Sequence, residues 1–339
     1  MKAAVFKEAE SVTVQDVPYP KLEPHAVILK VKSTGICGSD VHGYQRGRDQ
    51  PVIMGHEFAG DVVEIGAQVT NVKVGDRVVA MSGKGCGECY WCKQGQFIRC
   101  AKLQMVGLAP GLPGAFAEYV AVPSFKIGQY AAKMPDWMSY DEGAATEPLS
   151  VALHGVQQAS PQPDETAVVI GLGIIGLGVV QILKSMGVKQ IVAAGRREQR
   201  LKLAKDGGAT VVVDAAKDDV VPVVDKLTKG KGADVVFEVA GYESTFQQAL
   251  TMVHRGGRVD LIGLYGKPFN WSPSSIVGSD KLLLGCGLRW DLPGAMQLMA
   301  AKKINAKPLI THRFRLDKVK EAFETQIKSP DAIKVVVNP

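Results

Sequence analysis

The sequence predicts an α/β protein in which a β-rich region precedes a doubly wound parallel sheet. Over the first 150 residues, short Val-rich segments such as 26–31 and 61–65 are separated repeatedly by Gly, Pro and Asn, a pattern typical of strands and turns. From about Thr166 onward, apolar strands alternate with segments of helical periodicity. Strands separated by helices of this length indicate βαβ units, and therefore a parallel sheet with helices on both faces.

The parallel sheet is expected to begin with a strand at 167–170, followed by an amphipathic helix through 179–184. Further short apolar strands are expected at residues 190–194, 211–213, 234–239, 258–263 and 281–284. The segment 160–164, with two prolines, separates the two regions, and we expect a hinge there.

Composition is that of an ordinary globular protein with enough chain for two domains, since 46% of the 339 residues are hydrophobic and 22% are charged. No apolar run reaches the eighteen residues of a membrane span. The first eight residues carry charge where a signal peptide needs an apolar stretch, so a cytoplasmic location is expected. The net charge of +6 is dispersed along the chain, which argues against nucleic acid as a partner and leaves a small molecule.

Four of the six cysteines fall within fifteen residues, as Cys86-x2-Cys89-x2-Cys92-x7-Cys100. This spacing lets one loop place four thiolates around a single zinc ion in a closed, structural site. A disulfide framework is the alternative, but it is typical of small secreted domains rather than of a chain of this length. Cys37 lies apart from the cluster and is the cysteine with potential for chemistry.

A dinucleotide-binding fingerprint follows the first strand of the parallel sheet. Gly171 allows a tight turn, Gly173 lets a pyrophosphate approach the backbone, and Gly176 permits close packing of helix on strand. The intervening residues, Ile174 and Ile175, open the helix whose positive end would hold the phosphates.

The residue that reads the ribose is expected about twenty positions later, at the end of the second strand. An acidic side chain there accepts hydrogen bonds from the 2′-hydroxyl of NAD, but this strand ends in Gly195-Arg196-Arg197. Gly195 would leave room for a 2′-phosphate, and either arginine could bind it through charge-assisted hydrogen bonds. The sequence therefore favours NADP(H) over NAD(H), with solvated surface arginines as the alternative.

Potential metal ligands also lie scattered through the β-rich region. Cys37 begins a Cys-Gly-Ser-Asp-Val-His motif, His56 and Glu57 are adjacent, and Glu147 closes the region. A thiolate, an imidazole and a carboxylate can hold zinc with its fourth position open, as a catalytic site requires. From the residues alone, a hydrogen-bonded structural His–Glu pair remains equally open.

The chain resembles the zinc-dependent medium-chain alcohol dehydrogenases, most closely the polyol branch that contains sorbitol, butanediol and threonine dehydrogenases. Matching motifs occur in the same order along nearly the whole chain, at residues 37–42, 55–60, 74–78, 86–100, 147–149, 171–176 and 307–314. The resemblance implies a GroES-like catalytic domain over 1–150 with a structural zinc lobe at 86–100, a Rossmann NADP-binding domain over 151–287, and a return to the catalytic domain over 288–339. It also implies a homo-dimer or homo-tetramer.

Carried over by position, the resemblance makes Cys37, His56 and Glu147 the ligands of a catalytic zinc, with Glu57 behind them or exchanging into the metal shell. Two zinc ions per chain are therefore expected. Zinc would polarise the alcohol or ketone while hydride passes to or from the nicotinamide. Ser39 would accept the alcohol proton and pass it through cofactor hydroxyls to His42.

One loop departs from the sorbitol dehydrogenases, because the connection between His42 and His56 is shorter and carries Arg46 and Arg48. These arginines would favour an anionic substrate, although exposed loop arginines usually serve solubility. Arg289 lies roughly where the polyol branch directs an arginine to its substrate. Two other functions are possible for such a chain. One is a zinc-independent quinone or enone reductase, but such an enzyme has no use for Cys37, His56 and Glu147 together. The other is a nucleotide-sensing protein that binds the cofactor without turnover.

Overall fold

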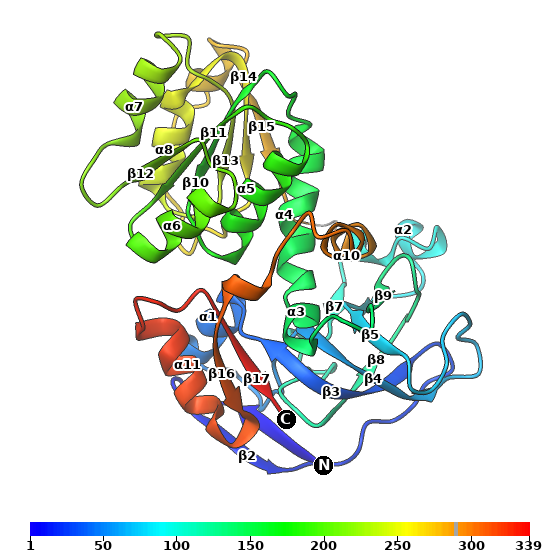
Figure 1. The fold of residues 1–339 in the computed structure, drawn as a ribbon. Coiled ribbons are helices and arrows are strands. Elements are labelled where there is room, and N and C mark those ends of the chain that lie inside the picture. The colour runs from blue at the N-terminus through cyan, green and yellow to red at the C-terminus, as the bar shows by residue number, and fades with distance from the viewer. Residues whose placement is uncertain (288–290) are drawn as a thin grey trace. The chain divides into compact units, whose positions relative to one another are not determined.

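The computed structural model describes residues 1–287 and 291–339, and the chain divides into two compact units (Figure 1). Unit 1 consists of Met1–Glu147, Leu292–Ala300 and Ala306–Pro339, and unit 2 of Pro148–Asp291 and Ala301–Asn305. The combination of a β-rich unit with a parallel-sheet unit confirms the predicted α/β fold class. Within the described ranges, no helix is long and apolar enough to cross a membrane.

Unit 2 is built on a six-stranded parallel sheet with the order β12-β11-β10-β13-β14-β15. Its strands are β10 (Thr166–Ile170), β11 (Gln190–Gly195), β12 (Val211–Asp214), β13 (Ala233–Glu238), β14 (Val253–Leu261) and β15 (Leu282–Gly285). Every residue of β10 and β13 is buried, which is why these strands read as uninterrupted apolar runs. All six strands coincide with segments expected from the sequence.

One helix precedes the first strand, and the others connect the strands and cover the sheet (Figure 1). They are α4 (Thr146–Ala159), α5 (Ile174–Ser185), α6 (Glu198–Asp206), α7 (Val220–Leu227), α8 (Glu243–Met252) and α9 (Ser274–Val277). The chain runs outward from β10 to β12 and then returns through β13 to β15. Because crossovers are right-handed, α5 and α6 lie on one face and α7 and α8 on the other. The strand order reverses between β10 and β13, the point at which such sheets bind ligands.

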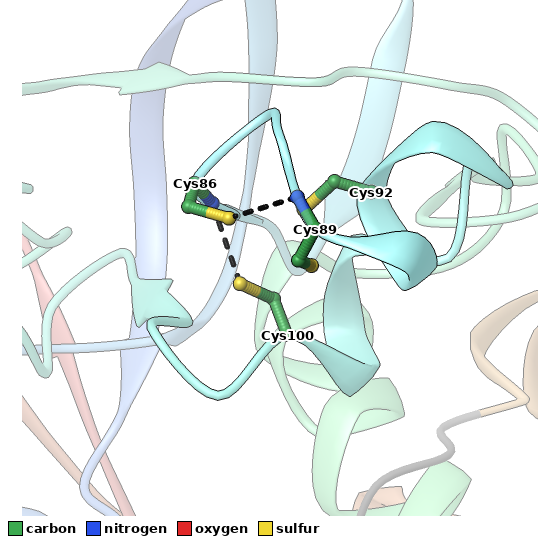
Figure 2. Close-up of side chains that lie close together, drawn as sticks. All are labelled: Cys86, Cys89, Cys92 and Cys100. Carbon is green, nitrogen blue, oxygen red and sulfur yellow. Dashed lines mark hydrogen bonds between the residues drawn. The ribbon is translucent and has the colours of Figure 1, made fainter.

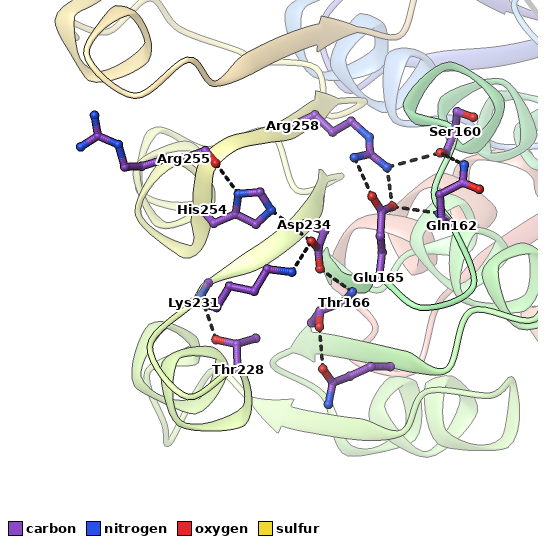
Figure 3. A network of polar contacts seen from close by, with 12 residues as sticks. Ser160, Gln162, Glu165, Thr166, Thr228, Lys231, Asp234, His254, Arg255 and Arg258 are labelled. Carbon is purple, nitrogen blue, oxygen red and sulfur yellow. Dashed lines mark hydrogen bonds and ion pairs between the residues drawn. The ribbon is translucent and has the colours of Figure 1, made fainter.

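The connection from α4 to β10 lies entirely within unit 2 and is held there by hydrogen bonds (Figure 3). It is not the expected hinge. Arg258 of β14 donates from Nη1 to Oε1 of Glu165 at 3.0 Å and from Nη2 to the carbonyl of Ser160 at 3.3 Å. The Gln162 amide donates to the same carboxylate at 2.9 Å. The expectation of a hinge at 160–164 is therefore wrong, because the division between the units falls at Pro148, inside α4.

Unit 1 contains a seven-stranded sheet with the order β16-β17-β3-β4-β5-β9, in which β8 also pairs with β3. These strands are β3 (Val27–Gly35), β4 (Glu57–Ile65), β5 (Arg77–Ala80), β8 (Tyr119–Val122), β9 (Ala131–Lys133), β16 (Ile310–Arg315) and β17 (Lys334–Asn338). Two strand pairs lie beside it, β1 (Lys2–Phe6) with β2 (Val12–Asp16) and β6 (Gly83–Lys84) with β7 (Gln104–Met105). Its helices are α1 (Gly38–Arg46), α2 (Tyr90–Lys93), α3 (Tyr140–Ala144), α10 (Leu292–Ala300), α11 (Val319–Lys328) and the 3-10 turns η1 (Phe97–Arg99), η2 (Lys307–Leu309) and η3 (Leu316–Lys318).

Strand register brings distant segments of unit 1 to one place. Gly35 at the end of β3 pairs with Glu57 at the start of β4 on one side and with Val336 of β17 on the other. Cys37 follows β3 directly and precedes α1. The end of β3, the start of β4 and the start of β17 therefore meet at a single point of the sheet.

Candidate zinc and nucleotide sites

The four clustered cysteines converge in unit 1 (Figure 2). The sulfur atoms of Cys86, Cys89, Cys92 and Cys100 all lie within 4.8 Å of one another. Four sulfurs around one zinc are separated by roughly 3.8 Å, given a Zn–S distance of about 2.3 Å. Two short turns produce the convergence, because Cys89 caps α2 and Cys100 ends η1. The donor set fits a closed zinc site.

Backbone amides of this lobe point at the sulfurs. The amide of Cys89 donates to Cys86 Sγ at 3.4 Å, and the amides of Cys86 and Lys102 donate to Cys100 Sγ at 3.3 Å. Hydrogen bonds of this kind stabilise a thiolate, and the amides of Glu88 and Cys89 lower the pKa of Cys86 to about 6. Burial instead raises the pKa of Cys92 to about 12, so without a cation the four sulfurs differ in their tendency to ionise. A bound cation would favour the thiolate form of all four.

A second group of potential ligands forms where β3, β4 and α1 meet. One ligand atom each from Cys37, His56 and Glu57 lies within 4.8 Å of the others. His56 and Glu57 are 7% and 1% exposed, and the three residues come from segments twenty residues apart in sequence. The structure thus brings together three of the four residues expected around a catalytic metal.

Two buried polar atoms in this group lack hydrogen-bond partners among the described residues. They are Nδ1 of His56 and Oδ1 of Asp40, which lie 3.6 Å apart, too far for a hydrogen bond. Burial alone would lower the pKa of His56, but Asp40 and Cys37 raise it well above its usual value. A carboxylate facing the rear nitrogen of an imidazole is the arrangement that orients a metal-binding histidine. The residues present fit a metal at this position.

Glu57 is held by a residue that the sequence analysis did not identify. Lys334, the first residue of β17, donates to both carboxylate oxygens of Glu57, at 2.9 and 2.6 Å, and to the carbonyl of Ile36 at 2.8 Å. Its side chain is 4% exposed. The only signal in the sequence was a single lysine before three consecutive valines in an otherwise buried strand.

Glu147, expected as the third zinc ligand, lies outside the 4.8 Å group, and Glu57 takes its place there. The charges of the group still act on the Glu147 carboxyl. Burial and Glu57 raise the pKa of Glu147, and His56 lowers it. Glu147 is the second residue of α4 and is 6% exposed. Glu57 therefore lies beside Cys37 and His56 and is neutralised by Lys334, while Glu147 is a second buried carboxyl that their charges influence.

Ser39 and His42 occupy successive turns of α1. Oγ of Ser39 is buried and has no hydrogen-bond partner in the described part of the chain, whereas His42 is exposed. Residues three apart on a helix are neighbours, so a proton on Ser39 has a short route to solvent along this helix. Arg289, the third arginine considered from the sequence, lies outside the described residues.

The glycine fingerprint has the expected geometry at the end of β10. Gly171 has a φ of +98°, which only glycine adopts readily. A Cβ on Gly176 would overlap the carbonyl oxygen of Gly171, whereas a Cβ on Gly173 would meet nothing within 4 Å. Gly173 is the N-cap of α5 and supplies no side chain to its amides. Ile174 and Ile175 form the first turn, so the helix end is free to bind an anion.

Arginines cluster at the end of β11. Arg196 is exposed, and Arg197 caps α6. Arg200 lies three residues further along in α6, and its pKa is lowered by burial and by the charge of Arg197. The sequence analysis missed Arg200, although its spacing of three from Arg197 in a helix was the available signal. A Cβ on Gly195 would lie 2.8 Å from Leu172, so packing is a sufficient reason for this glycine.

Comparisons with known proteins agree with this architecture. Family models for the alcohol dehydrogenase GroES-like domain and for zinc-binding dehydrogenases match residues 23–136 and 175–301. The chain is 31% identical to sorbitol dehydrogenase from Bacillus subtilis, covering 100% of this chain and 97% of the relative. It is 36% identical to L-threonine 3-dehydrogenase from Bacillus subtilis, and the match covers 100% of this chain and 99% of that relative. A solved zinc-binding dehydrogenase from Sinorhizobium meliloti bound to NADP is 30% identical, covers 100% of this chain and 99% of its own, and superposes with a TM-score of 0.89. The chain belongs to the zinc-type medium-chain dehydrogenases that act on alcohols and polyols.

Proposed function

We propose that the protein transfers a hydride between NADP(H) and a secondary alcohol, polyol or sugar derivative and its ketone. The observation that carries the proposal is the compact group of Cys37, His56 and Glu57. Beside it, Nδ1 of His56 and Oδ1 of Asp40 are buried without hydrogen-bond partners among the described residues. Those three residues and Glu147 would hold one zinc ion, and the four clustered cysteines a second. Zinc bound at the first group supplies Lewis acidity toward the hydroxyl or carbonyl oxygen.

The residues around this group have separate roles in the proposal. Ser39 accepts the hydroxyl proton when the alcohol is oxidised, because its Oγ is buried and no described residue forms a hydrogen bond with it. His42, exposed one turn further along α1, passes the proton to solvent. Asp40 orients His56, and Lys334 compensates the charge of Glu57.

The preference for NADP(H) is supported by charge at the end of β11. No carboxylate stands at residues 195–197, and Arg197 and Arg200 lie three residues apart at the start of α6. The acidic side chain that accepts hydrogen bonds from a ribose 2′-hydroxyl is therefore missing, and a 2′-phosphate would accept charge-assisted hydrogen bonds from the guanidinium groups. Solved relatives have been found with NADP and with NADH, so the support for this preference comes from the residues at the end of β11.

Self-association is also part of the proposal. Among the described strands, β15 is the last in its sheet, and its first residue, Leu282, is 54% exposed. An exposed apolar edge strand is a ready site for pairing with a second copy. Light scattering of the wild type should give the mass of a dimer or tetramer, and Leu282→Asp should lower it. A monomeric wild type would contradict this part.

Metal analysis tests the central proposal. The purified protein should contain two zinc ions per chain, and Cys37→Ser should contain one and transfer no hydride. Cys286→Ser is the matched control and should retain both metals and activity, since Cys286 belongs to neither group. If the zinc content of Cys37→Ser is unchanged, the assignment of the catalytic site fails. A zinc-independent reductase would keep activity after loss of that metal, and a nucleotide-sensing protein would bind NADPH without turnover.

A further inference from the structure

Arg48 is directed into the protein rather than into solvent. A Cβ on Gly43 of α1 would lie 2.8 Å from Cζ and 3.0 Å from Nε of Arg48, so its guanidinium rests directly on this buried glycine. Nη2 lies 3.3 Å from Sδ of Met54, which is fully buried. Arg46, two residues earlier, is exposed. Arg48 is therefore not the solubilising loop arginine that its sequence position would indicate.

This guanidinium lies beside the residues of the proposed reaction centre. Gly43 is four residues after Ser39 and three after Asp40, so all three share one face of α1. Residues so spaced have Cβ positions about 5–6 Å apart. Met54 is two residues before His56. Arg48 is thus placed about one helical turn from the serine that would accept the substrate proton.

One donor of Arg48 is buried and unused. An arginine carries five N–H donors, and a thioether sulfur is a weak acceptor for one of them. Its Nε is buried and has no hydrogen-bond partner among the described residues, and no carboxylate in that part of the chain forms an ion pair with it. Leaving this buried donor unpaired is unfavourable, so the guanidinium is suited to a ligand that supplies anionic oxygens in a bidentate arrangement.

We propose that Arg48 binds an anionic group of the substrate, a carboxylate or a phosphate, and so selects acidic sugar derivatives over neutral polyols. The anionic group sits a few bonds from the carbinol carbon, as the spacing of one helical turn between Arg48 and Ser39 requires. This inference rests on the proposed function, because it places the substrate at the same site. It makes Arg48 a specificity-determining residue.

The test compares three substrates that share one carbon skeleton: a hexitol, the hexonic acid with a carboxylate at one end, and the hexitol phosphate. With NADP+, wild-type kcat/KM should be highest for one of the two anionic forms, and which one identifies the group. Arg48→Met should lower that value about 100-fold, mainly through KM, and change the hexitol value less than threefold. Arg48→Lys should be intermediate. Gly43→Ala, which displaces the guanidinium without removing its charge, should act like Arg48→Met, and Arg46→Met is the matched control and should act like wild type.

Binding to the NADPH-loaded protein provides a readout without turnover, since reduced cofactor accepts no hydride. Calorimetry should show the preferred anionic form bound by wild type and bound about 100-fold more weakly by Arg48→Met. The inference is overturned if wild type prefers the hexitol, or if Arg48→Met weakens all three substrates equally. If wild type oxidises none of the three, the proposed function fails instead, and the binding comparison still decides the role of Arg48.

Discussion

The ammonium group of Lys334 lies 2.6 Å from the carboxylate of Glu57 in the interior of unit 1. The two residues are 277 positions apart in sequence and meet because β17 and β4 flank the same end of β3. Burial alone would lower the pKa of Lys334, but Glu57 and Cys37 raise it. The pair thus neutralises a buried carboxylate beside the proposed metal ligands.

Breaking this pair should destabilise the protein strongly. Lys334→Met leaves Glu57 buried without a counter-charge, and we expect a loss of about 3–5 kcal/mol in the free energy of unfolding. Urea unfolding at pH 7 measures it. Lys318→Met is the matched control, because the Lys318–Glu321 pair is exposed and should contribute little to stability. Lys334→Arg should retain most of the stability, and equal losses in Lys334→Met and Lys318→Met would refute the role of burial.

Asp260 gives unit 2 a pH-dependent stability. It is fully buried, neither of its carboxyl oxygens has a hydrogen-bond partner among the described residues, and it faces Gly155 of α4. Burial raises its pKa to about 7. Because the unfolded chain ionises near 3.8, the folded state holds the proton more tightly, and stability falls as pH rises from about 4 to 7.

Asp260→Asn should remove this dependence, since the amide does not ionise. At pH 8 the variant should be more stable than wild type by up to roughly 4 kcal/mol, because one pKa unit corresponds to about 1.4 kcal/mol. At pH 4 the advantage should disappear. Unfolding curves at the two pH values measure the difference, with exposed Asp206→Asn as the control. An advantage of the same size at both pH values would show that ionisation is not its cause.

The sequence predicted unit 2 better than unit 1 for a physical reason. Strands of a parallel sheet are buried on both faces and read as continuous apolar runs, so each was found from local residues alone. The pairing of Val336 with Gly35 depends on contacts across three hundred residues, and no local pattern encodes it. The contact between Lys334 and Glu57 could not be predicted for the same reason, since 277 residues separate them. The direction of the Arg48 side chain depends on a tertiary contact too, because it packs where a side chain on Gly43 would lie. Motif spacing alone predicted that the four cysteines converge, because metal chemistry restricts residue type as well as position, whereas Cys37 and His56 were predicted to share a site through the family resemblance.

The four-cysteine lobe should depend on its metal. Cys100→Ser removes one sulfur of the group, and zinc content should fall from two to one per chain. Residues 86–100 should then become sensitive to trypsin at Lys93 and Arg99, because a metal-free lobe has little apolar core of its own. Mass spectrometry of the fragments identifies the cleavage sites. Cys286→Ser should stay resistant, and equal resistance of Cys100→Ser would mean that the lobe folds without zinc.

The arginines at the end of β11 should determine cofactor choice. Arg196→Ala combined with Arg197→Ala removes the cations proposed to bind the 2′-phosphate, so the KM for NADPH should rise by one to two orders of magnitude while that for NADH changes little. Arg200→Ala should have the same selective effect, since Arg200 lies three residues after Arg197 and such residues are neighbours on a helix. Lys202→Ala, an exposed cation on the same helix, is the control. Initial rates with both cofactors at saturating substrate measure the ratio. Equal changes for NADPH and NADH would mean that these arginines contact a part common to both cofactors, and the phosphate assignment would then be wrong.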